Sequence, residues 1–139
     1  MKRVLWALAF AFVGIQFVPF GRNHTNPPVL QDSAWNSPKT RELAARACFD
    51  CHSNQTRWPW YSHVAPISWM VRHHVNEGRE HLNFSEAGRT YKDADEAGEV
   101  VREGEMPLPP YLLVHPEARL SPEEKRLLAE GLEAMFGKR

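Results

Sequence analysis

Two cysteines three positions apart, followed directly by a histidine, stand in the segment Cys48-Phe49-Asp50-Cys51-His52. This spacing is typical of the attachment site of a covalently bound c-type haem. Cysteines about one helical turn apart can each reach a vinyl group of the porphyrin, and the imidazole of the next residue then lies beneath the iron. We therefore predict that Cys48 and Cys51 anchor one haem c through thioether bonds and that His52 is its proximal axial ligand.

Three other roles are open to such a cysteine pair: a redox dithiol, a structural disulfide, or half of a zinc site. A zinc site normally adds a second pair of Cys or His ligands, yet the chain has only 2 cysteines. A thioredoxin-like dithiol lies in a βαβ pattern, and no alternation of strand, turn and helix surrounds this motif. Haem attachment is the interpretation that the sequence favours.

A methionine in a proline-rich segment is the second chemical feature, in Glu105-Met106-Pro107-Leu108-Pro109-Pro110-Tyr111. A stiff loop after a helix can hold a thioether rigidly over a haem face, so we predict that Met106 is the distal ligand. A Met/His pair favours electron transfer, because it leaves no open position on the iron and raises the potential. Met106 as a core filler is the alternative. His115, which precedes Pro116, is the strongest rival ligand among His63, His73, His74, His81, His115, Met70 and Met135.

The aromatic segment shortly after His52 is expected to lie against the same haem. Trp58, Trp60 and Tyr61 are predicted to form walls of the pocket. Arg57 and an indole N–H are candidate partners for the haem propionates, whose negative charges need compensation where they are partly buried. The alternative interpretation is ordinary core aromatics beside a solvated arginine.

The composition predicts one small helical domain. The chain has 139 residues, and those beyond an apolar N-terminal stretch suffice for one compact core. Lys plus Arg equals Asp plus Glu at 17 each, so no net charge indicates a nucleic-acid partner. Eleven prolines and few strand-like runs indicate short helices joined by long connections. We expect an all-α, cytochrome c-like domain around one covalent haem.

Capping signals and apolar periodicity predict four helices that position these residues. Ser37 and Ser121 each precede a proline suited to the first helical position, and Glu124 completes a capping box. The motif is expected to close the first helix, Met106 to follow the third, and the last helix to pack across the first. The predicted helices cover residues 37–48, 66–82, 94–104 and 121–136.

The N-terminus has the pattern of an export segment. Lys2 and Arg3 precede an apolar run from Val4 to Phe20, which would extend about 25 Å as a helix. We interpret it as an uncleaved membrane anchor rather than a buried core helix. The basic residues favour a cytoplasmic N-terminus and place the haem domain on the periplasmic side of the inner membrane. The predicted units are an anchor (1–21), an extended linker arm (22–36) and the haem domain (37–139).

The chain also resembles the short haem-binding domain family of bacterial c-type cytochromes. The resemblance implies a helical fold with a single covalent haem, held outside the cytoplasm by an N-terminal anchor. The family pattern carries over onto Cys48, Cys51, His52 and Met106. It rests on segments along nearly the whole chain beyond the anchor: residues 25–28, 48–56, 58–62, 65–69, 76–79, 82–85, 106–111, 115–118 and 120–121.

A membrane-tethered electron carrier, and not an enzyme, is the function that we expect. No Ser/His/Asp arrangement, paired-carboxylate site or glycine-rich phosphate loop stands out, so no catalytic residue is assigned. The expected partners are redox proteins and the membrane, without nucleic acid. If Met106 does not bind iron, a haem sensor or small peroxidase with an open distal site becomes the alternative. A haem subunit docked on a larger oxidoreductase is the third possibility.

Overall fold

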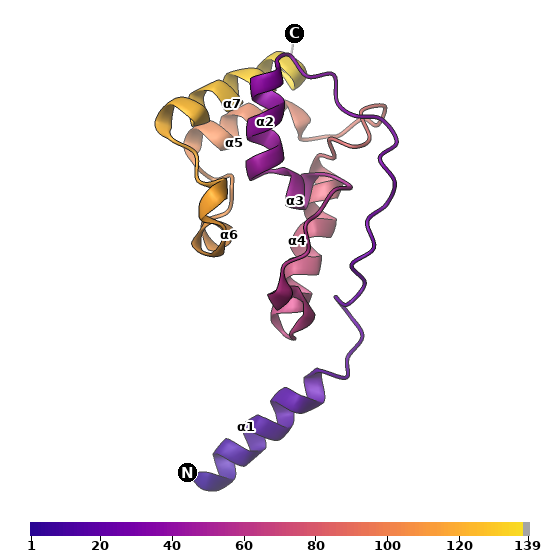
Figure 1. Ribbon diagram of the computed structural model, residues 1–139, viewed down its shortest axis with the longest axis vertical. Coiled ribbons are helices and arrows are strands. Elements are labelled where there is room, and N and C mark those ends of the chain that lie inside the picture. Colours follow the sequence, from indigo (N-terminus) through magenta and orange to yellow (C-terminus); the bar gives the residue numbers. More distant parts are fainter. Residues whose placement is uncertain (138–139) are drawn as a thin grey trace.

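The structure, a computed structural model, describes residues 1–137, and within this range it is all-helical and contains no strand, as predicted (Figure 1). A single isolated β-bridge joins Gln31 and Glu86. The helices, with η for 3-10 helices, are α1 (Lys2–Ile15), α2 (Pro38–Ala47), α3 (Phe49–His52), η1 (Trp60–His63), α4 (Ile67–His81), η2 (Ala94–Glu96), α5 (Ala97–Glu103), α6 (Pro109–Val114), η3 (Pro116–Ala118) and α7 (Pro122–Phe136).

The capping signals in the sequence determine where two of the helices begin. The Ser37 hydroxyl accepts a hydrogen bond from the Thr40 amide at 3.1 Å at the start of α2. At the start of α7, the Glu124 amide donates to the Ser121 hydroxyl, and the Ser121 amide donates to the Glu124 carboxylate. The four predicted helices are confirmed as α2, α4, η2 with α5, and α7.

Helix α7 packs across α2 and α5, and this crossing forms the hydrophobic core. Gly131 of α7 faces Thr40 of α2 so closely that a Cβ at position 131 would overlap the threonine side chain. The expected packing of the last helix across the first is thereby confirmed. The buried core residues on these and neighbouring elements are Leu43, Ala44, Phe49, Leu82, Phe84, Val101, Leu128, Ala129 and Leu132.

The extended segment 22–36 runs along the helical domain and bonds to it (Figure 1). The Leu30 and Gln31 amides both donate to the Ser85 carbonyl at 3.0 Å, and the Trp35 ring lies 5.0 Å from the Phe84 ring. These contacts anchor the segment on the chain that follows α4. Residues 22–36 are thus packed against the helical domain.

The proline-rich segment after Met106 is partly helical, where the sequence predicted a loop. Leu108 is the N-cap of α6, and Pro109 and Pro110 occupy the first turn. Amides of a first helical turn have no partner within the helix, so prolines there cost no hydrogen bond. Helix η3 follows at once, so that two short helices join Met106 to α7.

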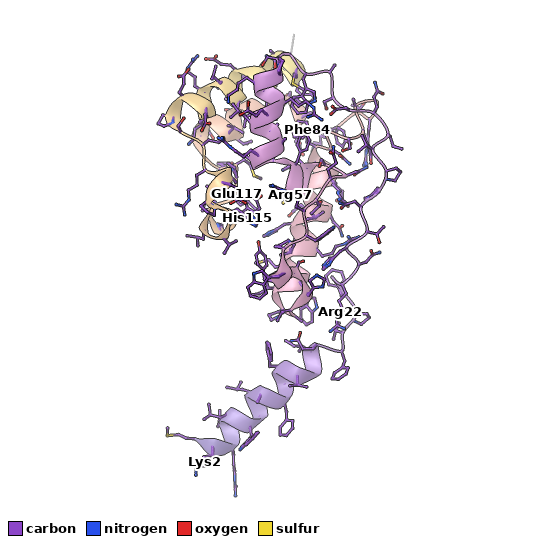
Figure 2. All side chains as sticks on the ribbon, viewed as in Figure 1. Lys2, Arg22, Arg57, Phe84, His115 and Glu117 are labelled. Carbon is purple, nitrogen blue, oxygen red and sulfur yellow. The ribbon has the colours of Figure 1, made fainter. Side chains whose placement is uncertain are left out.

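Helix α1 extends away from the rest of the molecule, and none of its residues is buried (Figures 1 and 2). Just beyond it, the Gln16 side chain donates to the Ala65 carbonyl at 2.9 Å and accepts from the Ala65 amide at 3.0 Å. Within residues 1–137, no helix is long and apolar enough to cross a membrane. Membrane association of the N-terminal segment stays a prediction.

Candidate functional site

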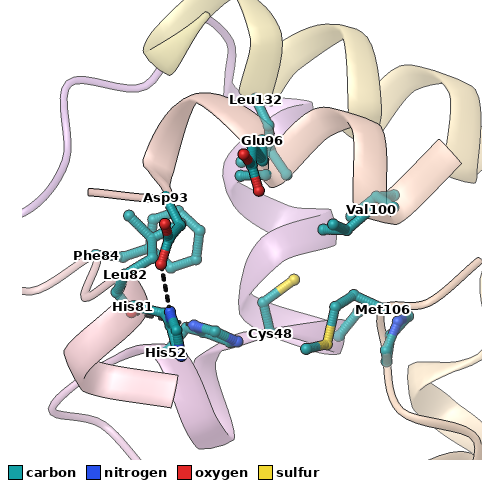
Figure 3. Close-up of a pocket in the computed structure, with 14 residues that line it drawn as sticks. Cys48, His52, His81, Leu82, Phe84, Asp93, Glu96, Val100, Met106 and Leu132 are labelled. Carbon is teal, nitrogen blue, oxygen red and sulfur yellow. Dashed lines mark hydrogen bonds and ion pairs between the residues drawn. The ribbon is translucent and has the colours of Figure 1, made fainter. Parts of the chain in front are cut away.

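Two adjoining cavities, of about 280 and 380 Å³, lie between the motif and the segment after α5. Cys48, His52 and Met106 line both cavities, and Cys51 lines the second. Figure 3 shows the first cavity, with the Cys48 and Met106 sulfurs and the His52 ring around the same space. The structure thus brings four of the predicted cofactor-binding residues together, Cys48, Cys51, His52 and Met106, although Met106 is far from the others in sequence.

The end of α2 and the single turn of α3 position the motif. Cys48 is the C-cap of α2, and its amide donates to the Ala44 carbonyl at 2.8 Å. Its carbonyl then accepts from the amides of Cys51 and His52, which closes the turn. The two thiols and the imidazole are therefore presented from one compact piece of backbone.

His52 is held in the form that can bind a metal. Its Nδ1–H donates to the Leu82 carbonyl at 3.1 Å, which leaves the lone pair of Nε2 available. Burial lowers the pKa of His52 below its usual 6.5, because desolvation disfavours the charged imidazolium. A neutral imidazole with one free nitrogen is the protonation state that ligation requires.

Both cysteines are free thiols in an apolar environment. Burial raises the pKa of Cys48 to about 12 and that of Cys51 to about 11. A catalytic dithiol needs at least one cysteine with a lowered pKa, because the thiolate is the nucleophile. This environment disfavours the redox-dithiol alternative.

Met106 follows the turn that ends α5. Gly104 has a φ of +84°, in the left-handed region, and the amides of Glu105 and Met106 both donate to the Val100 carbonyl, at 3.0 and 3.1 Å. The start of the methionine segment is thereby fixed on α5. Met106 and Pro107 line both cavities. This position agrees with a distal ligand, and ligation itself stays a prediction.

The structure does not bring the other four predicted residues into the lining of the two cavities. Arg57 is bound to Asp50, and the Trp58 indole N–H donates to the Asn26 side chain at 3.2 Å. Trp60 is 79% exposed, and the Tyr61 hydroxyl is hydrogen bonded to His115 at 2.6 Å. The pocket-wall and propionate roles that we expected for them find no support in this placement.

The length of α4 explains why Trp60, despite its proximity in sequence, does not line the cavities. Helix η1, which carries Trp60 and Tyr61, packs at the N-terminal end of α4, where the Ser68 amide donates to the Val64 carbonyl. His52 bonds to Leu82, just beyond the C-terminal end of this 15-residue helix. A helix of this length separates its ends by roughly 20 Å.

Among the rival ligands, His115 has partners on both ring nitrogens. Its Nε2 is bonded to the Tyr61 hydroxyl, and its Nδ1 lies 3.0 Å from the Glu117 carboxylate. His74 lines the second cavity, and His81 lines both, with Nδ1 donating to Asp93 at 2.6 Å. The remaining rivals, His63, His73, Met70 and Met135, are not among the residues that line the two cavities.

Asp50 and Tyr111 belong to the site although the sequence analysis assigned them no role. Both line the second cavity, and the Tyr111 hydroxyl donates to the Asp50 carboxylate at 2.8 Å. One signal was present in the sequence, because a carboxylate stands between the two cysteines that were expected to hold the haem. Its partner could not be identified, since sequence spacing does not show which donor folds back onto it.

The donor groups around the cavities fit haem. Two thiols, a neutral imidazole with one free nitrogen and a thioether line a space whose other walls include Leu82, Phe84, Val101 and Leu132. An all-helical fold with this set of side chains defines a haem-binding protein.

Comparison with known families agrees with this class. A model of the haem-binding domain family matches residues 10–134. The chain therefore belongs to the haem-binding domain family, and haem is its cofactor. No curated protein and no solved structure shows a significant match to the chain.

Proposed function

We propose that this protein is a mono-haem c-type cytochrome that carries electrons and is not an enzyme. In this proposal Cys48 and Cys51 hold the haem covalently, and His52 and Met106 are the axial ligands. The observation that carries the proposal is that all four side chains border the same adjoining cavities. Haem supplies a reversible one-electron couple when bound.

The residues of the chain have separate tasks in this proposal. The cysteines fix the cofactor in place, while the hydrogen bond from His52 Nδ1 to Leu82 orients the imidazole. Met106 would close the opposite side, and most of the other side chains that line the first cavity are apolar. A closed site with two protein ligands suits transfer of electrons better than binding of a substrate.

Absorption spectra of the oxidised and reduced full-length protein test the ligand assignment. We expect a low-spin c-type spectrum with a charge-transfer band from methionine to ferric iron. The band should disappear in Met106→Ala and persist in Met70→Ala, the matched control, because Met70 is half exposed on α4 and does not line the cavities. A high-spin wild type would reject the closed site and favour the sensor or peroxidase alternative.

Haem retention after denaturing extraction tests the covalent attachment. Cys48→Ala and Cys51→Ala should each weaken retention, and the double variant should lose the haem completely. Equal retention in the double variant and the wild type would overturn the attachment scheme. Co-purification of a stable larger complex after mild detergent extraction would instead support a haem subunit of an oxidoreductase.

We further propose that α1 associates with the membrane and that the haem domain lies on its periplasmic side, where it meets redox partner proteins. The apolar side chains of α1 are exposed all round, and Lys2 and Arg3 stand at its beginning. Membrane fractionation of the wild type and of Phe12→Asp tests this. Loss of the variant from the membrane fraction is expected, and an equal distribution would count against it.

A further inference from the structure

A buried carboxylate stands inside the cysteine motif and is surrounded by donors. The Asp50 side chain is 9% exposed. It accepts from the Arg57 amide at 3.0 Å, from the Arg57 guanidinium at 3.3 Å, and from the Tyr111 hydroxyl at 2.8 Å. A buried carboxylate needs such compensation, because an unpaired charge in the interior is strongly unfavourable.

Tyr111 connects this carboxylate to the segment that carries Met106. Tyr111 stands five positions after Met106, and three of the residues between them are prolines. The intervening chain therefore has little conformational freedom. The other end of the segment is fixed on α5 by the bonds of Glu105 and Met106 to Val100. The methionine is therefore held between two attachments, one on α5 and one on Asp50.

We propose that the Asp50–Tyr111 hydrogen bond is a latch that holds Met106 in its place opposite His52. Asp50 and Tyr111 are positioning residues in this proposal, which rests on the proposed Met/His ligation. With the latch closed, the attachment motif and the methionine segment move as one unit. With the latch broken, the haem stays attached, but the methionine side of the cavity opens more often.

The surroundings of Tyr111 keep its hydroxyl protonated, so that it remains a hydrogen-bond donor. Burial, followed by the nearby Asp50 charge, raises the pKa of Tyr111 far above its usual 10, so the hydroxyl keeps its proton. The ring also stacks on His115 at 4.1 Å between centroids, which restricts its rotation. Arg57 binds the same carboxylate from the side of the motif, and thereby keeps Asp50 oriented toward the tyrosine.

Carbon monoxide binding to the reduced, haem-loaded full-length protein tests the latch. Tyr111→Phe removes only the hydroxyl and should accelerate binding roughly 10- to 100-fold, the factor expected for a lost hydrogen bond to a charged group. Asp50→Asn keeps an uncharged acceptor and should give a smaller increase. Amide exchange at Leu108 and at residues 111–114, the positions of this segment that carry an amide hydrogen, should rise in both variants. Tyr91→Phe, the same change in a tyrosine that lines neither cavity, is the matched control.

The outcomes separate the latch from the proposed function. The proposal is overturned if Tyr111→Phe binds carbon monoxide within about twofold of the wild type while Met106→Ala binds it much faster. If the wild type already binds as fast as Met106→Ala, the Met/His ligation itself fails. If Tyr111→Phe does not mature, Asp50→Asn decides, and carbon monoxide binding by this variant within about twofold of the wild type overturns the latch.

Discussion

On the His52 side of the cavity, backbone contacts hold the geometry, because α4 packs closely against the turn of α3 at Gly78. A Cβ added at Gly78 would lie 2.7 Å from the Cys51 carbonyl oxygen. On the Met106 side, one segment is held by its bonds to Val100 and by side-chain links from α6, through Tyr111 to Asp50 and through His115 to Tyr61.

The different ways in which the two sides are held indicate whether each side controls retention of the haem or access to it. A close-packed backbone has no room to adjust, so its disruption costs stability or the cofactor itself. A segment held by single hydrogen bonds can open locally at much lower free energy while the rest stays folded. We therefore expect changes on the His52 side to affect retention of haem and changes on the Met106 side to affect access to it.

The largest effect is expected for His52→Ala. Loss of the imidazole removes the proximal ligand and leaves the Leu82 carbonyl without its donor. The native absorption spectrum of the loaded protein should be lost, while His73→Ala, a change at a mostly exposed histidine of α4, should leave it unchanged. An unaltered spectrum in His52→Ala would contradict the assignment of His52 as the proximal ligand.

Gly78→Ala should disturb the His52 side through packing alone. The added methyl group would press against the Cys51 backbone, and overpacking of this kind costs roughly 1–3 kcal/mol. Chemical denaturation measures this loss of unfolding free energy. Gly88→Ala is the control, because the nearest atom to its Cβ is the flexible Gln31 side chain at 3.4 Å. Equal unfolding free energies of Gly78→Ala and Gly88→Ala would contradict the view that close backbone packing holds the His52 side.

Tyr61→Phe should have a smaller effect on the opposite side. It removes the hydroxyl that bonds His115 at 2.6 Å, which should lower the unfolding free energy by about 1 kcal/mol. Amide exchange should increase in α6 and remain unchanged in α3. An equal increase in both helices would indicate that the two sides open together.

The smallest effect concerns the pH dependence of the α2–α7 contact. The Ser121 amide, followed by Arg46, lowers the pKa of Glu124 below its usual 4.5. The unfolded chain then binds a proton more readily than the folded one, so this stabilisation is present above pH 4.5 and is lost as the pH falls through the folded pKa. Glu124→Gln should flatten the fall in stability in that range, by a small amount because the group is only partly buried and solvent screens its charge. Denaturation curves from pH 3 to 6 measure the unfolding free energy of both proteins. The same pH dependence in the wild type and in Glu124→Gln would contradict this prediction.

The sequence by itself determined the local features of this protein. Capping residues act within a few positions, so the beginnings of α2 and α7 could be predicted from it. The motif predicted haem for the same reason, since Cys48, Cys51 and His52 are neighbours along one turn.

The tertiary structure alone decided which distant side chains meet. Trp58, Trp60 and Tyr61 follow the motif closely, yet none of them lines the cavities, while Tyr111 reaches Asp50 from far along the chain. Sequence distance does not measure spatial distance once the chain has turned back on itself. The partners of Asp50 and His52 depend on how whole helices pack, which is a property of all their contacts together.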